Sequence, residues 1–285
     1  MIKGIILDID GVIIGQKIGF NSPTPHADVI NALRKIREKD IFISLCTAKP
    51  HFAVDDIIKL AKLDNLHISD GGSVIVDPIN SVVVKKFVIE KQVAKDVIKA
   101  YLEKNVYTEF YTEGNYFIQK NQHSEITKKH LHILQKSPTE VDSLVNESSL
   151  NEITKIMPIA KDEEDKKRLT EIFKPFQNKL TLHWGVHPVA LPLQFGIITA
   201  PGISKKQAAI EIAKYYKVSF ENMLGVGDST SDWEFIQLCS FAGAMGNASK
   251  ELKELVSQKK QGMFCIGKTV DENGILDIFS FFKVL

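Results

Sequence analysis

The sequence predicts an α/β protein with a mostly parallel sheet, into which a separate α+β segment is inserted. At both ends of the chain, short apolar runs alternate with amphipathic segments of helical length, a rhythm that favours parallel βαβ units. Between these ends, the stretch from Val82 to Leu193 is richer in Lys, Glu, Gln, His and Tyr. We therefore predict a core made of residues 1–81 and 194–285, and an inserted domain made of residues 82–193.

The first strand of the predicted core ends in two carboxylates. An apolar run leads directly into Asp8 and Asp10, and Gly11 follows. Alternate residues of an extended chain point the same way, so the two acids can converge beyond the strand end, where open parallel sheets bind ligands. Two such acids need a shared cation or a proton. Alone, this pattern also fits the start of a polar loop, whereas Val12 and Ile13 argue against an EF-hand calcium loop.

The rest of the first core segment continues the same rhythm. After a flap over 12–20, we expect a helix from about Pro25, with Thr24 as its cap. The further elements that we expect here are a strand over 41–46, a helix over 51–62, a strand over 66–69 and a hairpin of 74–76 with 82–84.

The inserted segment mixes helices and strands, and the βα rhythm then returns. Within the insert we expect helices over 92–104, 124–135 and 162–173, strands over 106–111, 116–119, 153–159 and 180–184, and a polar stretch over 137–151. In the second core segment we expect a helix over 205–216 capped by Ser204, strands over 222–227, 241–245 and 262–266, and helices over 233–238, over 249–258 and at the C-terminus.

Composition and net charge narrow the class of protein and its expected partners. The 285 residues are 44% apolar and 25% charged and carry a net charge of +1, which is typical of a globular protein and gives no reason to expect nucleic acid or an anionic membrane as a partner. No apolar run reaches 18 residues, and the three cysteines lack metal-site spacing. We expect a cytoplasmic protein with reduced thiols and without a membrane span; the sequence carries no prediction of its oligomeric state.

Polar groups recur at the ends of the predicted core strands and form a set of motifs. These are Asp8-Ile9-Asp10-Gly11-Val12, Thr47-Ala48-Lys49-Pro50, Asp70-Gly71-Gly72, Gly202-Ile203-Ser204-Lys205 and Gly227-Asp228-Ser229-Thr230-Ser231-Asp232. In this order the chain resembles the haloacid dehalogenase-like phosphatase superfamily, in its Cof-like branch with a large α/β cap of type IIB. The resemblance implies a Rossmann-like core with the insert as a cap domain that sets substrate specificity.

The resemblance also implies roles for individual residues. Asp8 would be the nucleophile that forms an aspartyl-phosphate, and Asp10 would be the general acid and base. Mg²⁺ would be held by Asp8, by the backbone carbonyl of Asp10 and by Asp228, with support from Asp232. The residues that would bind the phosphoryl group or the substrate are Gly11, Thr47, Ala48, Lys49 and Lys205.

Some positions depart from the family pattern. Lys49 replaces an Arg, Ser231 replaces an Asn, and Asp70 stands where the family has an Asn. Near the end of the insert, His183, Trp184 and His187 are candidates for lining the substrate pocket, although packing or surface roles are the commoner outcome for such residues.

The resemblance predicts a phosphatase that acts on a small soluble phosphorylated metabolite, foremost a sugar or polyol phosphate. Two alternatives stay open at this point. One is a phosphomutase of the phosphomannomutase-like type, for which Lys49 and Lys161 are the available extra cations in or near the cap. The other is a non-catalytic phosphate-binding module, which the presence of Asp8, Asp10 and Lys205 disfavours.

Overall fold

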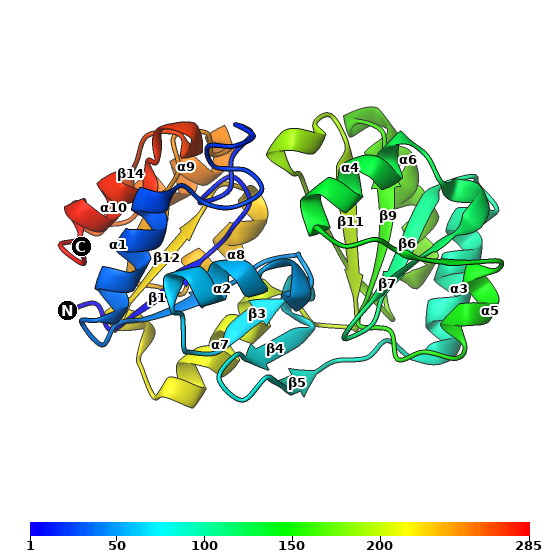
Figure 1. The fold of residues 1–285 in the computed structure, drawn as a ribbon, viewed down its shortest axis with the longest axis horizontal. Helices are drawn as coiled ribbons and strands as arrows, with labels where there is room; N and C mark the ends of the chain where they lie inside the picture. Colours follow the sequence, from blue (N-terminus) through cyan, green and yellow to red (C-terminus); the bar gives the residue numbers. More distant parts are fainter.

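The two ends of the chain share one parallel sheet, and the segment between them forms another (Figure 1). The structure is a computed structural model that describes residues 1–285. The core sheet has the order β14-β13-β12-β1-β2, and all of its pairs are parallel. Its strands are β1 (Gly4–Leu7), β2 (Phe42–Leu45), β12 (Met223–Gly227), β13 (Phe241–Ala244) and β14 (Phe264–Ile266). This confirms the predicted α/β class with a Rossmann-like core.

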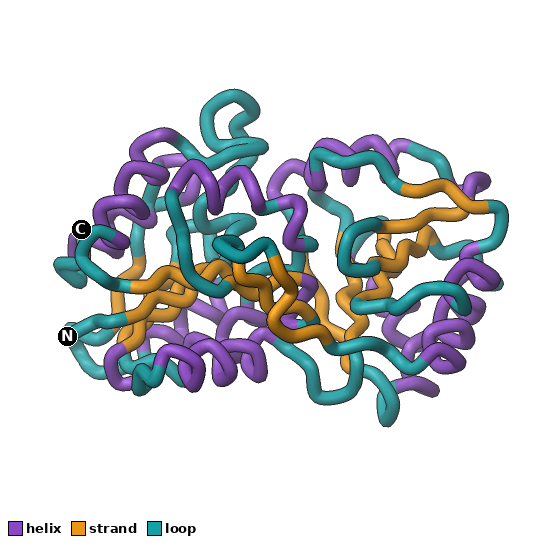
Figure 2. Tube along the Cα trace, turned by 60° about the horizontal axis from the view of Figure 1, so that its bottom comes forward, coloured by secondary structure: helices purple, strands orange, loops and turns teal.

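Helices cover both faces of the core sheet (Figure 2). They are α1 (Ala27–Arg37), α2 (Asp55–Ala61), α7 (Lys205–Tyr216), α8 (Trp233–Ile236), α9 (Lys250–Ser257) and α10 (Ile275–Phe281). The strands β1 and β2 are buried along their whole length, which explains why they read as continuous apolar runs. Because β1 lies between β2 and β12, the first strand of the chain is central to the sheet.

Of the two N-caps predicted for core helices, one is confirmed and one is wrong. Ser204 caps α7 as expected, since its side chain accepts a hydrogen bond from the backbone N–H of Gln207. For α1 the predicted cap, Thr24, is wrong. The helix begins two residues later than Pro25, and the Nδ1 of His26 accepts from the N–H of Asp28 at 3.3 Å. An imidazole at the N-cap position thus does what the nearby hydroxyl was expected to do.

The inserted segment is built on a mixed six-stranded sheet with the order β10-β11-β9-β6-β7-β8. Its strands are β6 (Tyr107–Tyr111), β7 (Tyr116–Gln119), β8 (Thr139–Val141), β9 (Lys155–Ala160), β10 (Thr181–Gly185) and β11 (Gln194–Thr199). Its helices are α3 (Lys91–Leu102), α4 (Glu125–Leu134), α5 (Leu144–Ser148) and α6 (Glu163–Phe173). The polar stretch predicted over 137–151 contains β8 and α5, which are short and carry little apolar patterning.

Strand pairing moves both predicted domain boundaries. A small third sheet joins β3 (His67–Ser69), β4 (Val74–Asp77) and β5 (Val82–Lys86), so the strand that begins at Val82 pairs with core residues. At the other end β11 pairs with β9 and β10, so residues 194–199 lie in the inserted sheet. Composition misplaced both limits because β5 is partly exposed and polar at its end, whereas β11 is apolar and buried. From here on, the cap means residues 87–199.

Core and cap each have apolar interiors of their own. One cluster of 47 buried residues surrounds the core sheet, and separate clusters of 18 and 10 fill mainly the two sides of the cap sheet. The chain crosses between the two parts only twice, after β5 and after β11 (Figure 1). This construction suits a cap that moves as a unit against the core. None of the helices is long and apolar enough to cross a lipid bilayer.

Candidate active site

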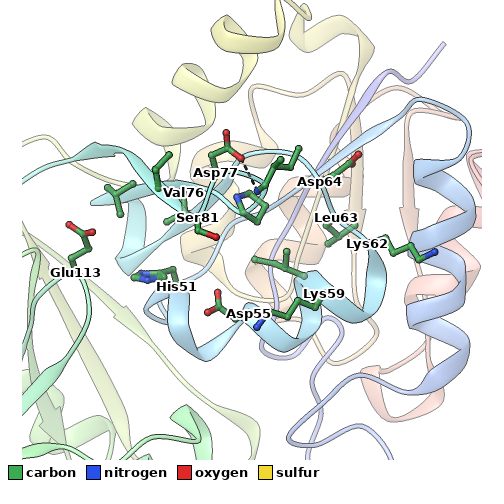
Figure 3. Close-up of a pocket in the computed structure, with 15 residues that line it drawn as sticks. His51, Asp55, Lys59, Lys62, Leu63, Asp64, Val76, Asp77, Ser81 and Glu113 are labelled. Carbon is green, nitrogen blue, oxygen red and sulfur yellow. Dashed lines mark hydrogen bonds between the residues drawn. The ribbon is translucent and has the colours of Figure 1, made fainter.

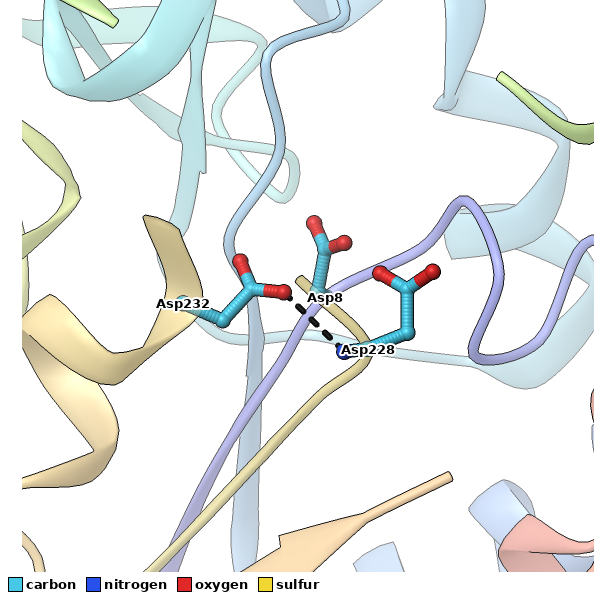
Figure 4. A group of neighbouring side chains, drawn as sticks. All are labelled: Asp8, Asp228 and Asp232. Carbon is cyan, nitrogen blue, oxygen red and sulfur yellow. Dashed lines mark hydrogen bonds between the residues drawn. The ribbon is translucent and has the colours of Figure 1, made fainter. Parts of the chain in front are cut away.

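An acidic cluster lies at the carboxyl ends of neighbouring core strands (Figure 4). Asp8 directly follows β1 and Asp228 directly follows β12, and the two strands pair in parallel with Leu7 opposite Val226. Together with Asp232, these acids each present an oxygen within 4.8 Å of the others. The register of two parallel strands therefore brings together residues from opposite ends of the chain.

Lys205 lies against this cluster from the first turn of α7. Its Nζ is 2.8 Å from Asp8 Oδ1 and 2.7 Å from Asp232 Oδ1. The ammonium thus bridges the predicted nucleophile and the acid that follows β12. A cation held this close can accompany a dianionic phosphoryl group onto Asp8.

Asp232 is fully buried, and both of its oxygens are already engaged. Oδ1 accepts from Lys205, and Oδ2 accepts from the backbone N–H groups of Asp228 and Ser229, each at 3.0 Å. The side chain therefore fixes the loop after β12 and the direction of Lys205. This agrees with a supporting role and leaves Asp8 and Asp228 as the acids with free oxygens.

Burial and mutual repulsion perturb the acids of this cluster. Burial together with Asp232 raises the pKa of Asp8 to about 7, although Lys205 opposes the rise. Burial together with Asp232 and Asp8 raises the pKa of Asp228 well above its usual range. Closely spaced carboxylates in a dry site need a proton or a cation between them. Oxygen donors of this kind are the ligands that Mg²⁺ prefers.

Gly11 makes room for Asp228. Its φ is +80°, and a Cβ at this position would come within 2.0 Å of Asp228 Oδ2. The carbonyl of Gly11 is itself held, because Asn247 Nδ2 donates to it at 2.8 Å. Asn247 lies outside the five sequence motifs, and no role was predicted for it. The turn after β1 is therefore shaped around the oxygens of Asp228.

Asp10 does not join the acidic cluster. Its Oδ1 lies 2.7 Å from Lys49 Nζ and 3.0 Å from His187 Nε2, which comes from the cap. These contacts have ion-pair distances but not the direction of a linear hydrogen bond to Oδ1. Burial alone would raise the pKa of Asp10, yet Lys49 and His187 outweigh it and hold that pKa below its usual range. In this structure Lys49, predicted to bind substrate, contacts the predicted general acid.

A cavity of about 60 Å³ lies above these strand ends, between the core and the cap. The predicted site residues that line it are Asp8, Asp10, Thr47, Ala48, Lys205 and Asp228. Ser231 also lines it, and its hydroxyl lies 2.8 Å from Ser229 Oγ. The hydroxyl oxygen of Thr47 accepts from the N–H of Lys49 at 3.1 Å. Most of the sequence motifs therefore meet around one small space.

Two of the three cap residues named as pocket candidates reach the core. His183 Nδ1 lies 3.1 Å from a carboxylate oxygen of Glu234 in α8, and His187 lies against Asp10 as described. Trp184 instead packs with the cap interior, and Lys166 Nζ lies 6.0 Å from the centre of its ring. Neighbours along β10 point to opposite faces, which separates His183 from Trp184. Glu234 was not predicted, because it has no place in the sequence motifs.

A larger groove lies elsewhere, between α2 and the β4–β5 hairpin (Figure 3). It has a volume of about 460 Å³, and charged residues such as Asp55, Lys59 and Glu113 line it. None of the predicted site residues borders it, and it lacks the acidic cluster. Size alone therefore does not mark the reactive site in this protein.

Comparison with known families decides the class of the protein. The family of haloacid dehalogenase-like hydrolases matches residues 5–279. The chain belongs to this family. The predicted resemblance is thereby confirmed, and so is the prediction of a hydrolase.

Named relatives and solved structures extend along the whole chain. The phosphatase YwpJ of Bacillus subtilis (strain 168) is 24% identical over 96% of this chain and 97% of its own length. The 5-amino-6-(5-phospho-D-ribitylamino)uracil phosphatase YwtE of the same organism is 22% identical over 96% of this chain and 95% of its own length. A structure of the HAD subclass IIB sugar phosphatase BT4131 has a TM-score of 0.80 at 20% identity and covers 99% of this chain and 100% of its own. At this identity the structural likeness shows the fold, including the cap.

Proposed function

We propose that this protein is a cytoplasmic, Mg²⁺-dependent phosphatase that hydrolyses a small soluble phosphomonoester through an aspartyl-phosphate. Sugar and polyol phosphates are the first class to test, since one of the structural neighbours is a sugar phosphatase. The observation that carries the proposal is the position of Asp8. Its carboxylate lies beside Lys205 and within one cluster with Asp228, at the sheet edge where ligands bind.

In the first step, an oxygen of Asp8 forms a bond to phosphorus while the bond between phosphorus and the alcohol oxygen breaks. Asp10 delivers a proton to the departing alcohol. Because Lys49 and His187 hold Asp10 ionised in this structure, the substrate must displace part of that contact, and Asp10 must take up a proton from water before it can act as the acid. In the second step, water attacks phosphorus, Asp10 takes its proton, and the bond to Asp8 breaks to release inorganic phosphate.

Three further groups support these steps. Lys205 offsets the charge of the phosphoryl group beside Asp8, and Thr47 offers its hydroxyl at the wall of the same cavity. Mg²⁺, held by Asp8, Asp228 and the backbone of Asp10, would supply positive charge that neutralises the phosphoryl oxygens. The cap closes over the cavity and excludes bulk water from it.

The structure gives no support to the phosphomutase alternative. Lys161, one of its two candidate cations, is exposed and lines neither of the cavities next to Asp10. The other, Lys49, is occupied by Asp10. A second phosphate would therefore meet no free cation from these two residues.

The test is phosphate release from p-nitrophenyl phosphate with Mg²⁺. We expect activity in the parent protein and a loss of about a thousandfold or more in Asp8→Asn, because the amide is a poor nucleophile. Asp142→Asn is the matched control, since the side chain of Asp142 is 89% exposed on the cap. An Asp8→Asn variant as active as the control would overturn the proposal.

A further inference from the structure

A second cavity of about 50 Å³ adjoins Asp10 on the side that faces the cap. It shares Asp10, Ala48, Gly185, Val186 and Ile197 with the cavity above Asp8. A phosphoryl group on Asp8 would direct its alcohol toward Asp10, the predicted proton donor. This second cavity is therefore the space into which the leaving alcohol extends.

Most polar side chains around this cavity are already committed. Lys155 pairs with Asp70 at 2.8 Å and donates to the carbonyl of Ala48 at 2.7 Å. The hydroxyl of Tyr111 donates to Glu109 Oε2 at 2.6 Å. Lys49 and His187 both face Asp10, as described above. None of these groups is available to a ligand without breaking an existing contact.

His130 is the exception. Its Nδ1 lies 2.8 Å from Glu109 Oε1, and the two side chains are 5% and 0% exposed. Its Nε2 has no partner within the protein, although the ring lines the cavity. Because Nδ1 donates to the carboxylate, a neutral ring presents the lone pair of Nε2 as an acceptor. Tyr111, through its bond to the same carboxylate, keeps Glu109 and hence His130 in place.

The walls around this free nitrogen are apolar. They are formed by Ile133, Leu134, Met157, Phe195 and Ile197, all of them buried. A ligand hydroxyl placed against such walls loses its water without gaining a partner, which disfavours an alcohol with many hydroxyls. The free space between these walls is small, about 50 Å³.

We propose that His130, oriented by Glu109, determines substrate specificity by binding a hydroxyl or N–H group of the leaving alcohol. The substrate class is a phosphomonoester of a short alcohol that carries one further donor group at the end remote from phosphorus. This inference rests on the proposed phosphatase function and narrows it, since the apolar walls of the cavity disfavour a hexose phosphate with its many hydroxyls.

The test compares matched phosphomonoesters in the presence of Mg²⁺. The probes are unbranched alkyl phosphates of two to six carbons, the same chains with a terminal hydroxyl, and glucose 6-phosphate. We expect the parent to prefer the hydroxylated member at one or more chain lengths by about tenfold or more in kcat/KM, and to use glucose 6-phosphate less well than that member.

The decisive variant is the double substitution Glu109→Gln with His130→Phe, which removes Nε2 without leaving a buried charge unpaired. We expect it to lose the preference, so that kcat/KM falls by about tenfold or more for the hydroxylated chains relative to the plain alkyl phosphates, because the plain chains offer no donor to Nε2. The control is Glu140→Gln with His123→Phe, a His–Glu contact of 3.0 Å on the cap surface whose histidine is 53% exposed. The control should keep the preference.

Three results would overturn the inference. One is a parent that cleaves plain and hydroxylated chains equally, and another is a double variant that retains the preference. A parent that uses glucose 6-phosphate best would be the third. In each of these cases phosphate is still released, so the phosphatase proposal survives. No release from any probe would overturn both proposals together.

Discussion

Lys155 carries the largest stability effect that we expect from one substitution. It reaches from β9 of the cap to Asp70 of the core at 2.8 Å, and both side chains are fully buried. Its Nζ also donates to the carbonyl of Ala48 and lies 3.7 Å from the centre of the Tyr111 ring. Lys155→Met would remove the charge, keep most of the volume, and leave the Asp70 carboxylate unpaired where cap and core meet.

The magnitude follows from the distance and the burial. Two charges 2.8 Å apart attract by about 6 kcal/mol at an effective dielectric constant of about 20. Burial opposes this attraction because it disfavours the charged form of Lys155. It lowers the pKa of Lys155 even though Asp70 acts to raise it. Breaking such a pair from one side costs about 3–5 kcal/mol, because the remaining charge stays buried. For a chain of this size that corresponds to a fall in Tm of roughly 5–8 °C.

The assay is urea unfolding of the parent, Lys155→Met, Asp70→Asn and the double variant. We expect the double variant to recover most of the loss, since neither residue then carries an unpaired charge. Its kcat/KM should remain below that of the parent, because the carbonyl of Ala48 has lost its donor beside the cavity. Lys86→Met is the control. Lys86 is 27% exposed and contacts Glu113 and Glu152, so its loss should cost less than about 1 kcal/mol.

The reasoning would be refuted by Lys155→Met lying within about 1 kcal/mol of the parent. It would equally be refuted by a double variant no more stable than Lys155→Met. Either result would mean that water or a local rearrangement already compensates Asp70.

Three further predictions concern the cation site and the core. Mg²⁺ at about a hundred times its Kd should stabilise the parent by about 2.7 kcal/mol, and Asp228→Asn should lose that shift and the EDTA-sensitive activity. Gly11→Ala should lower Mg²⁺ affinity while the protein stays folded by circular dichroism, because its Cβ would displace Asp228 Oδ2; unchanged affinity would contradict the packing described here. Burial lowers the pKa of His67 to about 4 from 6.5, so the unfolded chain binds the proton first and stability should fall by about 3 kcal/mol as the pH drops from about 6.5 to 4. His67→Gln should lose that component of the pH dependence in parallel urea titrations.

Local patterns in the sequence predict much of the core. The apolar run of β1 and the acids that follow it predict a buried strand with a polar end, and the strand lies there. Ser204 predicts the start of α7 and thereby the place of Lys205. These features depend on neighbours in the sequence, so the residues themselves carry the information.

Features set by packing across the chain were harder to predict. The motif that contains Lys49 predicts a substrate or phosphate ligand, and it does not predict the contact that the Lys49 ammonium makes with Asp10. The limits of the cap depend on strand pairing, because β5 pairs with β4 of the core and β11 pairs with β9 of the cap. Amino-acid composition carries no information about which strands pair. The contact of His130 with Glu109 joins α4 to β6, and neither residue stands in a recognisable motif.

The central place of β1 has a consequence for biosynthesis. Its neighbour β12 begins at Met223, so a growing chain presents β1 with one open edge until the last quarter of the protein has left the ribosome. The whole cap emerges in the meantime and can fold around its own sheet first. A product cut short before Met223 would lack Asp228 and Asp232 and would expose an apolar strand edge, which is a site for aggregation.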